Sequence, residues 1–328
     1  MSSRKIKWLL LFLVAFIAGG ELFARFYLGL GSPPLWESHP TIAFLFKPNQ
    51  RVHRFGNLFI TNRYAMRSDD FPPQKLNPRE LRILVFGDSV VNGGNLTDHS
   101  QLATTILAKH LSASLARPVV VGNASAGSWG PPNEIAYLRQ FGFLDADLII
   151  LVLSSSDYDD TPTFAPLDPL IRPTEAPVSA LWEGITRYLP RFFNRPAVNE
   201  AGIVPNAGEI PNKRNIRTAL EAEHEFLEMT KAEGVRILVV QHWTQSELEQ
   251  EKALAGHDEI QRIAVASGVP LYDDNDKLTL YAKSGRNPFR DDIHLNVNGQ
   301  QALAELLEGM VNHVLPEITA RAKVPIDK

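Results

Sequence analysis

The stretch Ile83-Leu84-Val85-Phe86-Gly87-Asp88-Ser89 decides how the rest of this chain is interpreted. Four consecutive apolar residues lead into a polar turn, and an apolar run of this length is typical of a strand buried in a parallel sheet. Such sheets carry their chemistry at the carboxyl ends of the strands, which is where Ser89 would lie. Gly-Asp-Ser alone favours a simple turn and helix cap, because those residue types are common in both, so the later sequence has to decide.

The segments after Ser89 alternate between helical and strand patterns. Apolar residues at helical spacing predict helices at residues 101–115, 132–141, 215–232, 257–266 and 299–314. Short apolar runs predict strands at residues 118–121, 148–153, 235–240 and 269–272. Alternating strands and helices form a parallel sheet with helices on both faces. We therefore expect an α/β fold, a three-layer α/β/α sandwich around a flavodoxin-like five-stranded parallel sheet.

Composition excludes several classes of function. The 328 residues suffice for one large α/β domain with appendages or for two small domains. A net charge of −4 without long charged runs gives no reason to expect a nucleic-acid partner. The absence of cysteine excludes disulfides, thiolate metal sites and a cysteine nucleophile. The acidic groups at residues 157–160 and 273–276 fit loops and helix starts, and no metal or cofactor is expected.

The amino terminus has the pattern of an export signal or a membrane anchor. Three basic residues among the first seven precede an apolar run from Trp8 to Gly20, which Glu21 and Arg25 then interrupt. Glu21 and Arg25 are one helical turn apart and could form an ion pair. We expect residues 1–30 to be an uncleaved signal anchor. The alternatives are a signal peptide that is cleaved near Ala18-Gly19-Gly20 and a buried helix of the α/β domain. The positive flank predicts inner-membrane association with the remaining chain on the periplasmic or extracytoplasmic side, or secretion after cleavage.

The remaining chain divides into three parts. Residues 31–80 are rich in proline and aromatics and predict an irregular cover or linker, with one short hairpin around Gly56-Asn57. Residues 81–320 hold the α/β pattern. A proline-rich insertion at residues 158–213 interrupts it directly after a predicted strand. An insertion in that place lies at the mouth of the sheet, as a lid or pocket wall or merely as packing.

A second polar motif, Asp291-Asp292-Ile293-His294, lies just before the last predicted helix. The spacing of Asp291 and His294 lets the carboxylate accept the Nδ1 proton and leaves Nε2 free to face another group. A histidine held in this way takes the proton of a serine hydroxyl during attack and returns it to the leaving group. Asp-x-x-His is common at helix starts, and it becomes informative only together with Ser89 in an α/β chain.

At residues 82–314 the chain resembles the GDSL esterases, also called SGNH hydrolases. Phe86-Gly87-Asp88-Ser89 matches the first motif of that family, and the run from Asp291 to Gly299 matches the last. The resemblance implies that Ser89 is the nucleophile, His294 the general base and Asp291 its orienting partner, with Asp292 as the alternative. It also implies the flavodoxin-like three-layer fold.

The two middle motifs of the family are altered here. The resemblance implies an oxyanion hole made by the N–H of Ser89, an N–H from Gly127 or Ser128, and a side chain that is commonly Asn. Ser156 occupies that Asn position, and its hydroxyl is shorter than a carboxamide. Loss of one such donor typically lowers turnover about 10²- to 10³-fold. Two residues that follow the third and fourth strands are expected to contact substrate: Asp157 and His242.

These observations predict a membrane-tethered serine esterase that forms an acyl-enzyme on Ser89. An acylated saccharide, such as an envelope polysaccharide carrying O-acetyl groups, fits the expected location. The same residues could transfer an acyl group to a sugar hydroxyl if water were excluded. A third hypothesis is an inactive binding protein in envelope assembly, which the change at Ser156 would mark.

Overall fold

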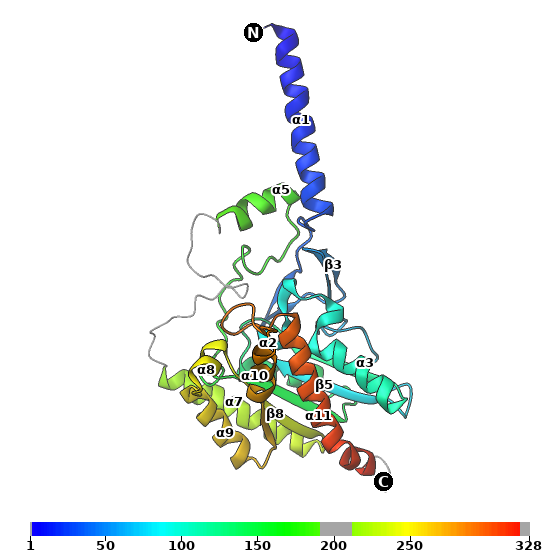
Figure 1. Ribbon diagram of the computed structural model, residues 1–328, viewed down its shortest axis with the longest axis vertical. Helices are drawn as coiled ribbons and strands as arrows, with labels where there is room; N and C mark the ends of the chain where they lie inside the picture. The colour runs from blue at the N-terminus through cyan, green and yellow to red at the C-terminus, as the bar shows by residue number, and fades with distance from the viewer. Residues whose placement is uncertain (1, 191–211, 322–328) are drawn as a thin grey trace.

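The central feature of the computed structural model, which describes residues 2–190 and 212–321, is a five-stranded parallel sheet (Figure 1). The strand order is β6-β5-β7-β8-β9, which is the flavodoxin-like order expected from the sequence. The strands are β5 (Leu81–Gly87), β6 (Val119–Ser125), β7 (Leu148–Ser154), β8 (Arg236–His242) and β9 (Leu271–Asp273). The order reverses between β6 and β7 around β5, so Ser89 emerges at the switch point where such sheets bind ligands.

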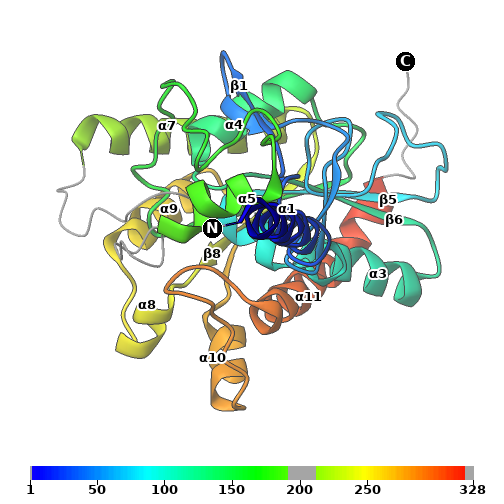
Figure 2. The same cartoon turned by 90° about the horizontal axis from the view of Figure 1, so that it is seen from above.

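Helices cover both faces of the sheet, which confirms the three-layer sandwich. One face carries α4 (Pro131–Phe141), α7 (Lys213–Ala232) and α9 (Ala255–Ala266), and the other carries α3 (Ala103–Leu115), α10 (Asn275–Lys283) and α11 (Val297–Arg321) (Figure 2). Alternate residues of β5 point to opposite faces: Leu84 and Phe86 pack with α4 and α7, while Ile83 and Val85 pack with α3 and α11.

Three short helices were not expected from the sequence. They are α2 (Ser89–Asn92), α8 (Gln245–Gln250) and α10. The first two are too short to show a helical stripe, and each begins at a polar cap directly after a strand. They redirect the chain at the carboxyl edge of the sheet.

The segment expected to be an irregular cover is more regular than the sequence indicated. It forms two antiparallel hairpins, β1–β2 (Trp36–His39 and Ala43–Phe46) and β3–β4 (Arg51–Arg54 and Asn57–Ile60). The second is the hairpin predicted around Gly56-Asn57. The first was missed because β2 is buried at every position, so its sequence shows no alternation. Aromatic side chains of both hairpins pack on one another and extend the core.

The first helix, α1 (Ser3–Phe26), is long and apolar enough to cross a membrane and projects from the α/β body (Figure 1). Its last turns contact the insertion. The Glu21 carboxylate accepts hydrogen bonds from Arg25 and, at 2.9 Å each, from the backbone N–H groups of Ala180 and Leu181. These N–H groups begin α5 (Ala180–Glu183), which continues into one π-helical turn, η3 (Gly184–Tyr188). Residues 191–211 of the predicted insertion lie outside the described residues.

A buried ion pair joins the insertion to the chain that follows α1. Arg54 pairs with Glu183, and both side chains are almost completely buried. Arg54 also donates to the carbonyl of Gly29 at 3.1 Å and to the Tyr188 hydroxyl at 2.7 Å, while the N–H of Gly31 donates to Glu183 at 2.6 Å. The part of the insertion around α5 is therefore held by the amino-terminal segment.

Candidate active site

Ser89 is placed by a sharp turn from β5 into α2. Asp88 caps the helix by accepting a hydrogen bond from the N–H of Val90 at 2.8 Å. A side-chain carbon at Gly87 would lie 2.6 Å from the side chain of Val91, so the close approach of strand and helix requires glycine. As the first residue of α2, Ser89 keeps a backbone N–H that the helix itself does not use.

The structure brings His294 and Asp291 to Ser89 from a distance of about two hundred residues. His294 Nε2 lies 2.9 Å from Ser89 Oγ, and Nδ1 lies 2.8 Å from Asp291 Oδ2. Asp291 Oδ1 also accepts the N–H of Ile293 at 3.1 Å and the N–H of His294 at 2.8 Å. Burial tends to raise the pKa of Asp291, but the hydrogen bonds from His294 and from these N–H groups lower it to about 2. The carboxylate therefore stays ionised and fixes the imidazole.

Asp292, the alternative partner, has a different task. Its carboxylate accepts hydrogen bonds from the N–H of Ser246 at 2.9 Å and from the Ser246 hydroxyl at 3.2 Å, at the start of α8. The two neighbouring aspartates thus point to different elements, and only Asp291 contacts His294.

The expected substrate contact of His242 is not what the structure shows. The ring is fully buried, with Nδ1 2.5 Å from Asp274 Oδ2 and Nε2 2.9 Å from the carbonyl of Ile293. Both acceptors require a proton on the facing nitrogen, so the ring is an imidazolium. Burial lowers its pKa, but the Asp274 carboxylate and the Ile293 carbonyl outweigh that effect and raise the pKa to about 9. His242 supports the loop that carries His294 and does not line the pocket around Ser89.

The loop after β7 also differs from the expectation. Asp157 is buried, and its carboxylate accepts the N–H of Ser154 at 2.6 Å and the Ser154 hydroxyl at 3.1 Å. It therefore braces its own loop and does not line the pocket around Ser89. The exposed Ser156 places its hydroxyl 2.9 Å from that of Ser154 and does not line the pocket around Ser89.

The loop after β6 does reach the pocket. Gly127 lines it, while Ser128 adopts a positive φ of 67° and points its hydroxyl toward Arg172. Arg172 Nη2 donates to the Ser128 hydroxyl at 3.1 Å and to the Gly127 carbonyl at 3.3 Å. A residue of the insertion therefore holds the loop that was expected to form part of the oxyanion hole.

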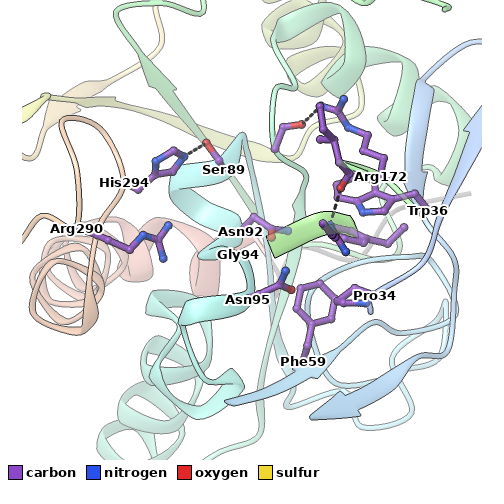
Figure 3. Close-up of a pocket in the computed structure, with 14 residues that line it drawn as sticks. Pro34, Trp36, Phe59, Ser89, Asn92, Gly94, Asn95, Arg172, Arg290 and His294 are labelled. Carbon is purple, nitrogen blue, oxygen red and sulfur yellow. Dashed lines mark hydrogen bonds between the residues drawn. The ribbon is translucent and has the colours of Figure 1, made fainter. Parts of the chain in front are cut away.

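The pocket around Ser89 and His294 is built by five separate parts of the chain, of which the loop after β6 gives Gly127 (Figure 3). The amino-terminal hairpins and the residues before them give Pro34, Trp36, Phe46 and Phe59; the turn after Ser89 gives Asn92, Gly94 and Asn95; the insertion gives Ile171, Arg172 and Arg187; and Arg290 precedes the histidine motif. The sequence analysis missed these residues. Only Asn92, in the polar turn after Ser89, and Arg290, beside the histidine motif, had a sequence signal that could have pointed to them.

A serine held against a carboxylate-oriented histidine, at the switch point of a parallel α/β sheet, defines the class of serine hydrolases. The sequence model of the GDSL-like lipase/acylhydrolase family matches residues 83–307, which is more than half of the chain. The chain belongs to this family and is a carboxylic ester hydrolase.

Solved structures of similar fold are distant in sequence. An α/β hydrolase from the metagenome of Lake Arreo has 16% identity and a TM-score of 0.47, covering 71% of this chain and 95% of its own. The lipase/acylhydrolase from Enterococcus faecalis has 16% identity and a TM-score of 0.43, covering 71% and 96%. An acetyl-xylooligosaccharide esterase from Geobacillus has 11% identity and a TM-score of 0.43, covering 69% and 92%. No curated protein matches the chain significantly.

Proposed function

We propose that the protein cleaves a carboxylic ester through an acyl-enzyme on Ser89. The observation that carries this proposal is the continuous series of contacts from Asp291 through His294 to Ser89 Oγ, at 2.8 and 2.9 Å, at the edge of a pocket. His294 Nε2 takes the Ser89 proton as Oγ attacks the carbonyl carbon, then gives it to the leaving alcohol oxygen. Water, deprotonated by the same nitrogen, attacks the acyl carbon and releases the acid.

The oxyanion hole of this proposal has two backbone donors, the N–H groups of Ser89 and Gly127. Gly127 lines the pocket, and its peptide is held by Arg172. Ser156 has no place in it, because its hydroxyl is engaged with Ser154 outside the pocket lining. One missing donor is worth about 10²–10³ in turnover. We therefore expect a slower enzyme than one with the full set of donors.

We further propose that α1 tethers the enzyme to a membrane, with the pocket on the extracytoplasmic side. The basic residues in the first turns of α1 favour that orientation, and the contacts of Glu21 with α5 keep the insertion beside the base of the helix. An O-acylated envelope saccharide is the substrate class that this location favours.

The test uses the full chain in detergent micelles, with a fluorophosphonate probe and p-nitrophenyl acetate. We expect labelling and turnover in the native protein, and loss of both in Ser89→Ala and of turnover in His294→Ala. Asp292→Asn is the matched control and should retain both. Absence of labelling in folded native protein, indistinguishable from Ser89→Ala, would refute the mechanism. Acyl transfer to added saccharide at the expense of hydrolysis would reassign the reaction to a transferase.

A further inference from the structure

We propose that the pocket recognises an oxyanion, a carboxylate or phosphate, that the substrate carries outside its scissile ester, and that Arg172 is the principal contact. The substrate class is therefore an ester of an acidic saccharide. This inference rests on the proposed function and adds to it the chemistry that selects the substrate.

The lining of the pocket is strongly biased in charge. It includes Arg172, Arg187 and Arg290 and, among the residues that the structure describes, no aspartate or glutamate. Arg187 is neutralised in part by Glu183, whose carboxylate lies 3.3 Å away. Figure 3 draws Arg172 and Arg290 on opposite sides of the pocket, with Asn92 between them. A ligand lying across Ser89 would therefore pass between two guanidinium groups.

Arg172 is held rigidly by uncharged groups. Its guanidinium lies 4.0 Å from the centre of the Phe44 ring and 5.6 Å from that of Trp36. Among the described residues, its guanidinium donates hydrogen bonds to the Gly127 carbonyl and the Ser128 hydroxyl, both neutral acceptors. Within the described parts of the chain, no carboxylate oxygen lies within 4.0 Å of the Arg172 guanidinium, which is the distance limit of an ion pair.

A guanidinium in this setting has a reason to bind an anion. Burial lowers the pKa of Arg172 to about 10, yet the group remains protonated at neutral pH. Asp168 acts on Arg172 from beyond ion-pair distance, so the partly buried charge keeps a desolvation cost that an incoming oxyanion would remove. The planar fork of arginine donates two parallel hydrogen bonds to carboxylate or phosphate oxygens. The aromatic wall of Trp36, Phe46 and Phe59 supplies a flat apolar surface beside it.

A purely structural role for Arg172 makes a different prediction. If the side chain only fixes the loop at Gly127 and Ser128, its loss damages the oxyanion hole for every ester alike. If it binds the substrate anion, its loss changes the ratio of kcat/KM between an anionic and a neutral ester. This ratio cancels any effect on the loop, and a recognition role should appear mainly in KM.

The experiment compares three matched esters with the full chain in micelles: a monoacetylated methyl glucuronoside, its neutral carboxamide, and a monoacetylated methyl glucoside 6-phosphate. A hydrogen bond to a charged group contributes about 1.5–3 kcal/mol, which corresponds to roughly a 10- to 150-fold preference for an anionic ester. We expect Arg172→Gln to bring the ratio close to one and Arg172→Lys to keep part of it. Arg63→Gln, at an exposed arginine paired with Asp70, should leave the ratio unchanged.

Equal kcat/KM for anionic and neutral esters in the native protein would overturn the inference, as would an equal loss for all three in Arg172→Gln. Preference for only one of the two anionic esters would show whether the pocket selects a carboxylate or a phosphate on the saccharide. Calorimetric binding of the same esters to Ser89→Ala supplies a readout that needs no turnover. If neither turnover nor fluorophosphonate labelling occurs but Ser89→Ala prefers the anionic esters, the mechanism fails and the anion site stands.

Discussion

The substitution Asp291→Asn should abolish almost all activity while leaving the fold intact. In the native site, Asp291 Oδ1 accepts two backbone N–H groups, and His294 Nδ1 lies 2.8 Å from Oδ2 and 2.9 Å from Oδ1. In the variant, the amide oxygen must stay with the two N–H donors, because the amide NH₂ cannot face them. The amide nitrogen then takes the Oδ2 position beside Nδ1.

That exchange puts the imidazole in the wrong tautomer. An amide N–H donates to an unprotonated Nδ1, so the ring proton moves to Nε2 and points at Ser89 Oγ, 2.9 Å away. The histidine can then no longer take the Ser89 proton. The same tautomer error in a serine protease costs about 10⁴-fold in kcat. Allowing for residual exchange between tautomers, we expect a loss of about 10³- to 10⁴-fold, or about 4–5 kcal/mol in activation free energy.

Steady-state and burst kinetics with p-nitrophenyl acetate measure this effect, and thermal melts monitor folding. Because the pKa of Asp291 is lowered to about 2, its carboxylate stays ionised from pH 5 to 9, and the large loss should be seen throughout that range. Asp292→Asn removes the neighbouring carboxylate, which contacts Ser246, and should change kcat less than about threefold. More than a tenth of native activity in Asp291→Asn, or an equal loss in Asp292→Asn, would refute the assignment of Asp291.

Three further predictions test the packing of the protein. Burial raises the pKa of Glu223 to about 9, against the opposing effect of Arg262. This folded-state pKa lies above the unfolded value of 4.5. The contribution of Glu223 to the free energy of unfolding is therefore fully present below pH 4.5 and is lost as the pH rises toward 9. Glu223→Met should therefore gain stability relative to the native protein by at most about 1.4 kcal/mol per pH unit across that window, measured by urea unfolding, and a constant difference would contradict it. Arg54→Met leaves the buried Glu183 with Arg187 as its remaining ion-pair partner and should cost up to about 3–5 kcal/mol, whereas adding Glu183→Leu should restore much of it. A side-chain carbon at Gly256 would lie 1.8 Å from a backbone carbonyl oxygen of the loop after β7, so Gly256→Ala should lower the free energy of unfolding by about 1–3 kcal/mol. Gly309 has open space around it in an exposed part of α11, so Gly309→Ala should raise the free energy of unfolding by up to about 1 kcal/mol.

The sequence was sufficient where the signal is local. The apolar runs of β5 and β7 and the helical stripe of α11 predicted the sheet and its layers, because burial on both faces leaves few polar residues in such elements. The spacing of Asp291 and His294 predicted their contact, because three residues in a turn suffice to bring carboxylate and imidazole together. The same reasoning explains why Asp291 and not Asp292 was the first choice.

The sequence was insufficient where polar residues are buried by distant contacts. His242 and Asp157 follow strands at the catalytic edge of the sheet, which made them candidates for substrate contact. Asp274 and Ser154 instead engage them inside the protein. No local pattern distinguishes a polar residue that faces a ligand from one that braces a loop, because both stand at the same position relative to the strand.

The pocket wall shows the same limit and also how the parts of the chain depend on one another. Arg172 belongs to the insertion, which α1 supports through Glu21 and which the buried Arg54–Glu183 pair holds against the hairpins. The aromatic rings under Arg172 come from the first hairpin. A chain that begins after Gly31 would keep Ser89, His294 and Asp291 but lose the carboxylate that caps α5. Activity of such a chain reports on the catalytic residues, whereas recognition of the substrate has to be measured with α1 in place.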